Sequence, residues 1–284
     1  LCSDGDLSGG QHWIPYQGDL MGPHGQRQSR KRNDLEDTMK RVGLVVAYDG
    51  TNYCGWQSQN NGITIQGELN RCLSELVGEE IETIGASRTD AGVHAMGNVA
   101  VFDTNARMPA EKFSYALNTR LPEDIRIQLS EEVEPDFHPR YCESEKTYEY
   151  RILNRRFPVP TERLYSYFYH YELDVDKMRA ATSYLIGQHD FASFCGAKAQ
   201  VKSTVRIITR IEVERYGDLV TIQVSGKGFL YNMVRIIAGT LIQVGNGQYP
   251  PEHVKAILDA CDREMAGPTA PAHGLTLMGI RFLE

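Results

Sequence analysis

The stretch Ala86-Ser87-Arg88-Thr89-Asp90-Ala91-Gly92-Val93-His94 lies between two apolar runs that are typical of β-strands. Its small residues leave room for a large planar ligand to approach Asp90, and Arg88 is close enough in sequence to keep that acid ionised or to touch the same ligand. A carboxylate in such a setting is a candidate nucleophile. The spacing alone allows a second interpretation, in which Thr89 or Asp90 caps a helix that begins at Ala91.

Length and composition indicate a globular protein with a substantial core. The 284 residues suffice for one large or two small domains. The 41% hydrophobic and 24% charged residues are ordinary for a soluble protein. No run of 18 apolar residues occurs, so we expect no membrane span. The six cysteines form no Cys-x-x-Cys pair, which disfavours a zinc site or disulfide framework and favours free thiols in a reducing cytoplasm.

The overall charge limits how the chain could meet nucleic acid. A formal net charge of −7 disfavours a protein that coats itself in nucleic acid through bulk charge. A local basic groove remains compatible with that sum, because affinity follows the phosphates that are contacted. The acidic balance also keeps open an aspartate-nucleophile hydrolase that acts on small molecules.

Residues 1–38 differ from the rest of the chain. They contain Gly-Gly, Pro, Gln and His and a basic cluster at 30–32, without apolar periodicity. They also lack the charged and apolar regions of a secretory signal. We expect a non-native or disordered leader, with the natural start at Met39.

Strands and helices alternate along the remaining chain. In the first half, strands are expected over 42–48, 81–84, 98–103 and 125–133, with helices after Thr64 and Pro109. In the second half, strands are expected over 147–153, 206–214, 219–225 and 279–283, with helices over 174–187, 229–244 and 252–260. This order predicts two α+β halves, residues 39–143 and 144–284, each a sheet with helices on one face. A cleft between them could take a nucleic-acid strand.

Two further side chains attract attention. Arg235 lies in an apolar helical segment, where a guanidinium must meet a carboxylate or reach a polar cleft. Its partner could be any acid, in a purely structural pair, or it could be Asp90, which it would keep ionised. Tyr148 shares a strand face with Tyr150, so its ring could pack in the core or stack on a nucleobase.

The order of several motifs resembles the TruA-type tRNA pseudouridine synthases. The similar segments are the opening stretch, Asp49–Gln57, Phe137–Arg140 (with proline in place of a small residue), Glu145–Arg151, Gly187–Phe194 and Met233–Arg235. The resemblance extends over residues 40–284, and the leader has no counterpart in it.

The resemblance implies a fold and an activity. The fold would be the pseudouridine synthase fold, an α+β architecture with two RRM/ferredoxin-like halves. Together these form a mostly antiparallel sheet with helices on one side and a central RNA-binding cleft. The enzyme would be a cytoplasmic isomerase that converts uridines 38, 39 and 40 of the tRNA anticodon arm to pseudouridine. It would need neither a cofactor nor a metal, and it would act on tRNA as a homodimer.

The resemblance also implies roles for particular residues. Asp90 would be the catalytic residue, Tyr148 would stack on the uracil, and Arg235 would pair with Asp90. Arg88 would fill the space left by the displaced base or contact the RNA backbone. An alternative is a non-catalytic RNA-binding protein of the same architecture, which would need no carboxylate beside Tyr148 and Arg235.

Overall fold

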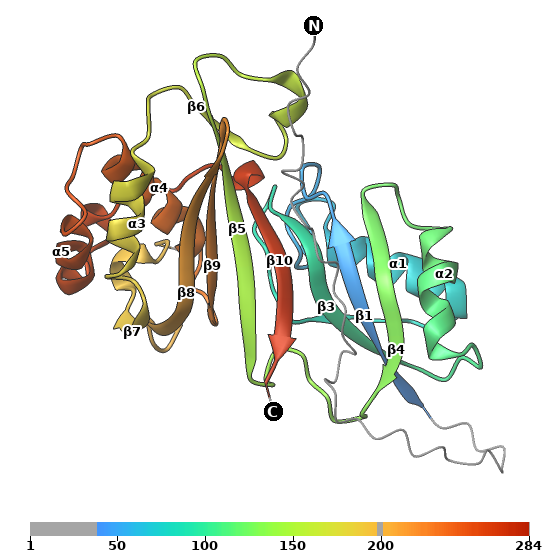
Figure 1. Ribbon diagram of the computed structural model, residues 1–284. Coiled ribbons are helices and arrows are strands. Elements are labelled where there is room, and N and C mark those ends of the chain that lie inside the picture. The colour runs from blue at the N-terminus through green and yellow to red at the C-terminus, as the bar shows by residue number, and fades with distance from the viewer. Residues whose placement is uncertain (1–38, 198–200, 284) are drawn as a thin grey trace, which may run out of the picture.

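The computed structural model describes residues 39–197 and 201–283, so the predicted leader lies outside the described residues. One large sheet organises this part of the chain, with strand order β4-β1-β3-β10-β5-β9-β8-β7; β2 is added to β3 and β6 to β5 (Figure 1). The strands are β1 (Lys40–Tyr48), β2 (Ile84–Gly85), β3 (His94–Thr104), β4 (Ile125–Val133), β5 (Ser144–Asn154), β6 (Tyr167–Tyr169), β7 (Gly187–Asp190), β8 (Val205–Tyr216), β9 (Leu219–Lys227) and β10 (Leu275–Phe282).

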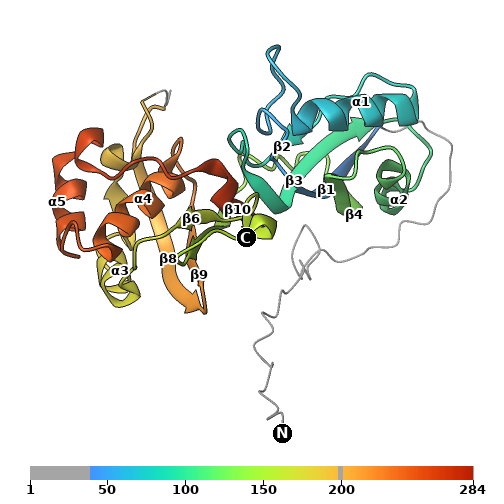
Figure 2. The ribbon, with the colours of Figure 1, turned by 90° about the horizontal axis from the view of Figure 1, so that it is seen from above.

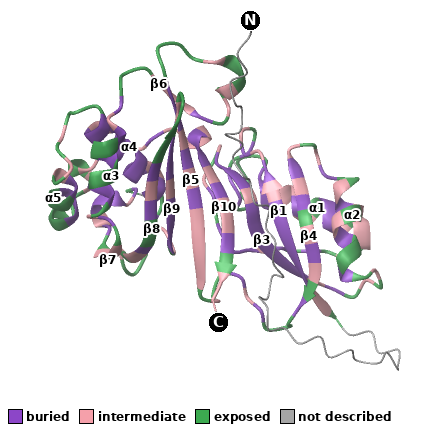
Figure 3. Ribbon diagram, in the orientation of Figure 1, coloured by how far each residue is buried: buried purple, intermediate pink, exposed green. Residues whose placement is uncertain are grey.

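The helices cover one face of this sheet. They are α1 (Ile65–Val77), α2 (Phe113–Asn118), α3 (Val175–Thr182), α4 (Met233–Gly245) and α5 (His253–Ala260). Figure 2 shows α1 and α4 on the same side of the sheet, α1 over the N-terminal strands and α4 over the C-terminal ones. Buried residues concentrate in the central strands and in α4 (Figure 3). The predicted α+β class with a mostly antiparallel sheet is confirmed.

Helix α1 illustrates how local sequence sets an element. The Thr64 side chain accepts a hydrogen bond from the backbone N–H of Gly67, which satisfies one free donor at the helix start. Its apolar residues recur on one face and are buried, among them Ile65, Leu69 and Leu73. Gly78 ends the helix in the left-handed region at φ 73°.

The last strand joins the two halves of the sheet. Strand β10 lies between β3 and β5, with Thr276 opposite His94 in a parallel pairing and Leu277 opposite Tyr148 in an antiparallel one. The start of β3, which directly follows the Asp90 segment, is therefore separated by only one strand from β5, which holds Tyr148.

Several predicted boundaries were wrong, mainly because tertiary contacts override local patterns. The helix expected over 229–244 begins only at Met233, since Asn232 adopts φ 60° and interrupts the helical path. The final strand begins at Leu275, where pairing on both sides extends it beyond the expected 279–283. The strand at 81–84 shrinks to Ile84–Gly85, and the helix expected to run to 187 ends at Thr182.

No helix in the described ranges is long and apolar enough to cross a membrane.

Candidate active site

The segment with Asp90 is a loop between β2 and β3 that the N-terminal part of the chain holds in place. The backbone N–H of Trp56 donates to the Thr89 carbonyl at 3.1 Å, and the Tyr48 hydroxyl lies 2.7 Å from Thr89 Oγ1. From β3, the buried Asn98 side chain accepts from the N–H of Ser87 at 3.2 Å and donates to its carbonyl at 3.0 Å. The part of the loop that precedes Asp90 is thus pinned at Ser87 and Thr89 by buried polar contacts, which fixes the backbone that presents Asp90.

Two glycines let the chain approach this loop closely. A Cβ on Gly50 would lie 2.0 Å from the Val93 carbonyl oxygen. At Gly55 it would lie 2.6 Å from the Thr89 carbonyl oxygen, and the residue also has φ +90°. Only glycine satisfies both demands at Gly55. The Asp49–Gln57 motif therefore supports the Asp90 loop through its backbone.

The helix-cap interpretation of Asp90 is wrong. The residues after it form a turn, closed by a 3.1 Å hydrogen bond from the Val93 N–H to the Asp90 carbonyl, and β3 begins at His94. No helix follows the loop, so the Asp90 carboxylate has no capping role there.

Arg235 of α4 forms an ion pair with Asp90. Its Nη1 lies 3.6 Å from Asp90 Oδ2, an ion-pair distance, and both side chains are mostly buried, with 17% and 23% of their areas exposed. Other contacts hold the guanidinium in position: Nε donates to the Ala270 carbonyl at 2.7 Å and Nη1 donates to Asn232 Oδ1 at 2.9 Å. The left-handed backbone of Asn232, which starts α4 late, also positions the arginine.

The pair with Arg235 alone would lower the pKa of the Asp90 carboxyl, but the net shift is upward. Burial raises the pKa of the Asp90 carboxyl, and Arg235 lowers it without cancelling the effect of burial. Arg235 therefore opposes protonation, but the net pKa is above the ordinary aspartate value. A poorly solvated carboxylate of raised basicity is a stronger nucleophile than a surface carboxylate.

Tyr148 is connected to the same loop. Its hydroxyl lies 2.8 Å from Ser87 Oγ, and its ring meets Phe229 edge-to-face at a centroid distance of 5.1 Å. Burial is the main cause that raises its pKa to about 12, and the charge of Asp90 raises it further. The hydroxyl is therefore protonated at neutral pH.

Arg88 is not paired with Asp90. Its side chain is exposed, and its charge lowers the pKa values of Arg140 and Lys146. The structure thus brings Asp90, Arg235 and Tyr148 together and places Arg88 with two other cations.

Sequence reasoning missed several neighbours of the site. Ser87 and Phe229 contact Tyr148, and Asn98 and Asn232 hold the loop and the arginine. Lys146 could have been found, because it lies two residues before Tyr148 and alternate strand residues share a face. Within the described ranges, no group of three His, Cys, Asp or Glu side chains is arranged to hold a metal ion.

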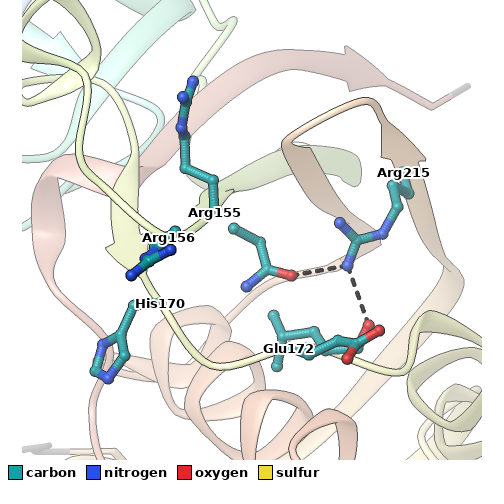
Figure 4. A pocket seen from close by; sticks show the side chains of 7 residues that line it. Arg155, Arg156, His170, Glu172 and Arg215 are labelled. Atoms are coloured by element: carbon teal, nitrogen blue, oxygen red, sulfur yellow. Dashed lines mark hydrogen bonds between the residues drawn. The ribbon is translucent and has the colours of Figure 1, made fainter.

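A separate pocket of about 500 Å³ lies at the ends of β5, β6 and β8 (Figure 4). It is lined by Asn154, Arg155, Arg156, His170, Glu172, Leu173 and Arg215. Arg215 donates to Asn154 Oδ1 at 2.8 Å and to the Leu173 carbonyl at 3.0 Å. Asp90 does not line this pocket, so it offers no support for a small-molecule hydrolase built on that carboxylate.

Comparison with known proteins decides the family. The family model described as tRNA pseudouridine synthase matches residues 44–142 and 181–283. The chain belongs to the tRNA pseudouridine synthase family. Within this family, tRNA pseudouridine synthase A from Thermoanaerobacter sp. (strain X514) is 48% identical over 244 residues, which are 86% of this chain and 100% of the relative. A tRNA pseudouridine synthase A 2 from Clostridium tetani is 51% identical over 240 residues, 84% of this chain and 97% of the relative.

Among solved structures, the archaeal box H/ACA sRNP Nop10-Cbf5 complex contains a distant neighbour. It is similar at a TM-score of 0.30 and 12% identity, over 84% of this chain and 46% of that chain. A similarity this low adds nothing to the family assignment.

Proposed function

We propose that this protein isomerises uridine to pseudouridine in the anticodon arm of tRNA, at nucleotides 38, 39 and 40. One observation is the main support: in a member of the tRNA pseudouridine synthase family, the carboxylate of Asp90 lies 3.6 Å from Arg235 and beside the buried Tyr148. The non-catalytic alternative, which needs no carboxylate at this place, has no corresponding support.

The reaction needs only groups that the chain supplies. The N1–C1′ glycosidic bond breaks, the uracil turns, and a C5–C1′ bond forms. The proton on C5 leaves and N1 gains one, so atoms and electrons balance without an oxidant or cofactor. In this proposal the ionised Asp90 carboxylate attacks C1′ as N1 leaves, and the Asp90–C1′ bond breaks when C5 attacks C1′, which regenerates the carboxylate. Arg235 supports that ionised form against the effect of burial.

Tyr148 has two parts in the proposed reaction. A stacked target base must leave the RNA stem before Asp90 can reach it, and the aromatic ring offers a face for the displaced uracil. The hydroxyl is protonated at neutral pH, so it cannot act as a base alone. It can relay a proton, because it shares a 2.8 Å hydrogen bond with Ser87 Oγ.

We further propose a cytoplasmic homodimer. Two chains would assemble more basic surface than the formal charge of −7 suggests. The described cysteines are free, which fits a reducing compartment. Light scattering after size-exclusion chromatography tests the dimer, and a single-chain mass at micromolar concentration contradicts it.

Release of tritium from tRNA labelled at C5 of uridine tests the proposed reaction, because the C5 proton is lost only if the new bond forms. We expect release from transcripts with uridine at position 38, 39 or 40. The matched control is the same transcript with cytidine at these three positions. Binding of tRNA without any release would favour the non-catalytic alternative.

Replacing Tyr148 with phenylalanine separates the two proposed parts of this residue. The ring and its contact with Phe229 remain, and only the hydroxyl is lost. We expect kcat to fall by about a hundredfold or more, with little change in KM. Ser87→Ala shortens the relay but keeps the Tyr148 hydroxyl, so its kcat should lie between those of the wild type and of Tyr148→Phe. Full kcat in Tyr148→Phe would limit the residue to stacking.

A further inference from the structure

Three cations gather on the Asp90 loop, and none of them has an acidic partner among the described residues. Lys146 Nζ donates to the Ala86 carbonyl at 2.7 Å, and Arg140 Nη2 donates to the adjacent Gly85 carbonyl at 3.1 Å. Arg88 is near enough for its charge to lower the pKa of both groups. We name Arg88, Arg140 and Lys146 the basic triad. It connects the start of β5 with the loop that presents Asp90.

When no RNA is bound, holding the three cations of the triad close together is unfavourable. Burial and the charges of Arg140 and Arg88 lower the pKa of Lys146 to about 8. Burial and the charge of Arg88 also lower the pKa of Arg140. Cations that repel one another in a partly buried place call for an anion that offsets the cost.

The carboxylates near the triad are already engaged. Glu145, adjacent to Lys146, pairs with Arg281 at 2.7 Å and accepts from Thr209. Glu143 pairs with Lys227 at 3.3 Å. Within the described ranges, no ion pair joins a member of the triad to a carboxylate, although the formal net charge of the chain is −7.

We propose that the basic triad binds a backbone phosphate of the tRNA close to the uridine held at Asp90. This inference rests on the proposed function and adds the residues that hold the substrate. Phosphate contacts from lysine and arginine set the register of a nucleic acid without reading its sequence. Lys146 is two residues from Tyr148 on the same strand face, about 7 Å along the strand. A phosphate bound at Lys146 would place one nucleotide of the tRNA anticodon arm against Tyr148 and Asp90.

A double-mutant cycle between protein and RNA tests the contact. Binding of a synthetic anticodon stem–loop RNA is measured for the wild-type protein and for Lys146→Met. The loop phosphates are replaced one at a time by neutral methylphosphonates. At one position we expect the replacement to weaken wild-type binding by on the order of tenfold, and to leave Lys146→Met binding unchanged. Additive losses at every position would overturn the proposal.

Salt dependence separates a lost charge from a distorted loop. Lys146→Gln keeps a hydrogen-bond donor without the charge, and Lys146→Arg keeps the charge. The slope of log affinity against log salt should fall by about one for Lys146→Gln and for Arg140→Gln. It should stay near the wild-type value for Lys146→Arg. Lys255→Met is the matched control, because Lys255 is an exposed lysine of α5 paired with Asp259. An unchanged slope in Lys146→Gln contradicts a phosphate contact.

The tritium-release assay distinguishes a failure of the triad proposal from a failure of the proposed isomerase activity. Wild-type release of tritium together with unchanged salt slopes would overturn the role of the triad and leave the isomerase standing. Absence of wild-type release would overturn the isomerase itself. Thermal melting of each variant shows that the fold persists, and Arg140, whose side chain is exposed, can be replaced without opening the core.

Discussion

Asp90→Asn is expected to lower pseudouridine formation by at least about a thousandfold, while tRNA binding persists. Asparagine keeps the size of the side chain and can still accept a hydrogen bond, but it supplies no nucleophilic carboxylate. Single-turnover tritium release measures the chemical step, and filter binding of tRNA measures affinity separately. The loop should remain in place, since Ser87 and Thr89, rather than the Asp90 side chain, make its pinning contacts.

Asp103→Asn is the matched control for this change. Asp103 is also an ion-paired aspartate, 2.7 Å from Arg41, but it lies on β3 at the far end from the loop. Its replacement should leave kcat unchanged. Wild-type turnover in Asp90→Asn would remove the carboxylate from the mechanism.

Arg235→Met is expected to reduce activity at neutral pH by about tenfold to a hundredfold and to change its pH dependence. Burial already raises the pKa of Asp90, and Arg235 is the group that opposes the rise. Without the guanidinium the pKa of Asp90 rises further. A nucleophilic carboxylate works in its ionised form, so the rate increases as pH rises through that pKa. The acidic limb of the profile should move to higher pH, and the loss should shrink in alkaline solution.

Two variants make this result specific. Arg235→Lys keeps the positive charge, so its acidic limb should return toward the wild-type position. Arg179→Met removes an arginine that pairs with Asp176 of α3 and Glu214 of β8 instead of Asp90, and its profile should match the wild type. An Arg235→Met enzyme with reduced rate but an unshifted acidic limb would mean that the arginine only holds structure.

Local sequence predicted the parts of this protein better than their arrangement. The alternation of residues around Tyr148 and the capping threonine of α1 depend on neighbours in sequence, and both elements form where expected. The meeting of Asp90 with Tyr148 depends on β10, in which Thr276 and Leu277 pair with strands from both halves of the chain. No local pattern encodes that pairing, so the strand was expected four residues too late.

The chemistry of the site shows the same division. The apolar setting of Arg235 showed that it needed a partner, and Asp90 was among the candidates that the motifs supplied. The sign of the Asp90 pKa shift could not be deduced from the pair alone, because it depends on how much water the folded chain excludes. Local sequence places Lys146 on the strand face of Tyr148, but its electrostatic setting arises from Arg88 and Arg140, which other segments bring beside it.

The place of β10 has a consequence for biosynthesis. Residues 275–282 are synthesised after the other nine strands of the sheet, yet within the described residues they pair with both β3 and β5 at its centre. A nascent chain can pair β1 with β3, and β5 with β9, before this strand emerges, because each half contains its own strands. Asp90 and Tyr148 therefore acquire their mutual placement only after β10 has emerged. A nascent chain that still lacks β10 would therefore not modify the tRNAs that decode its own message.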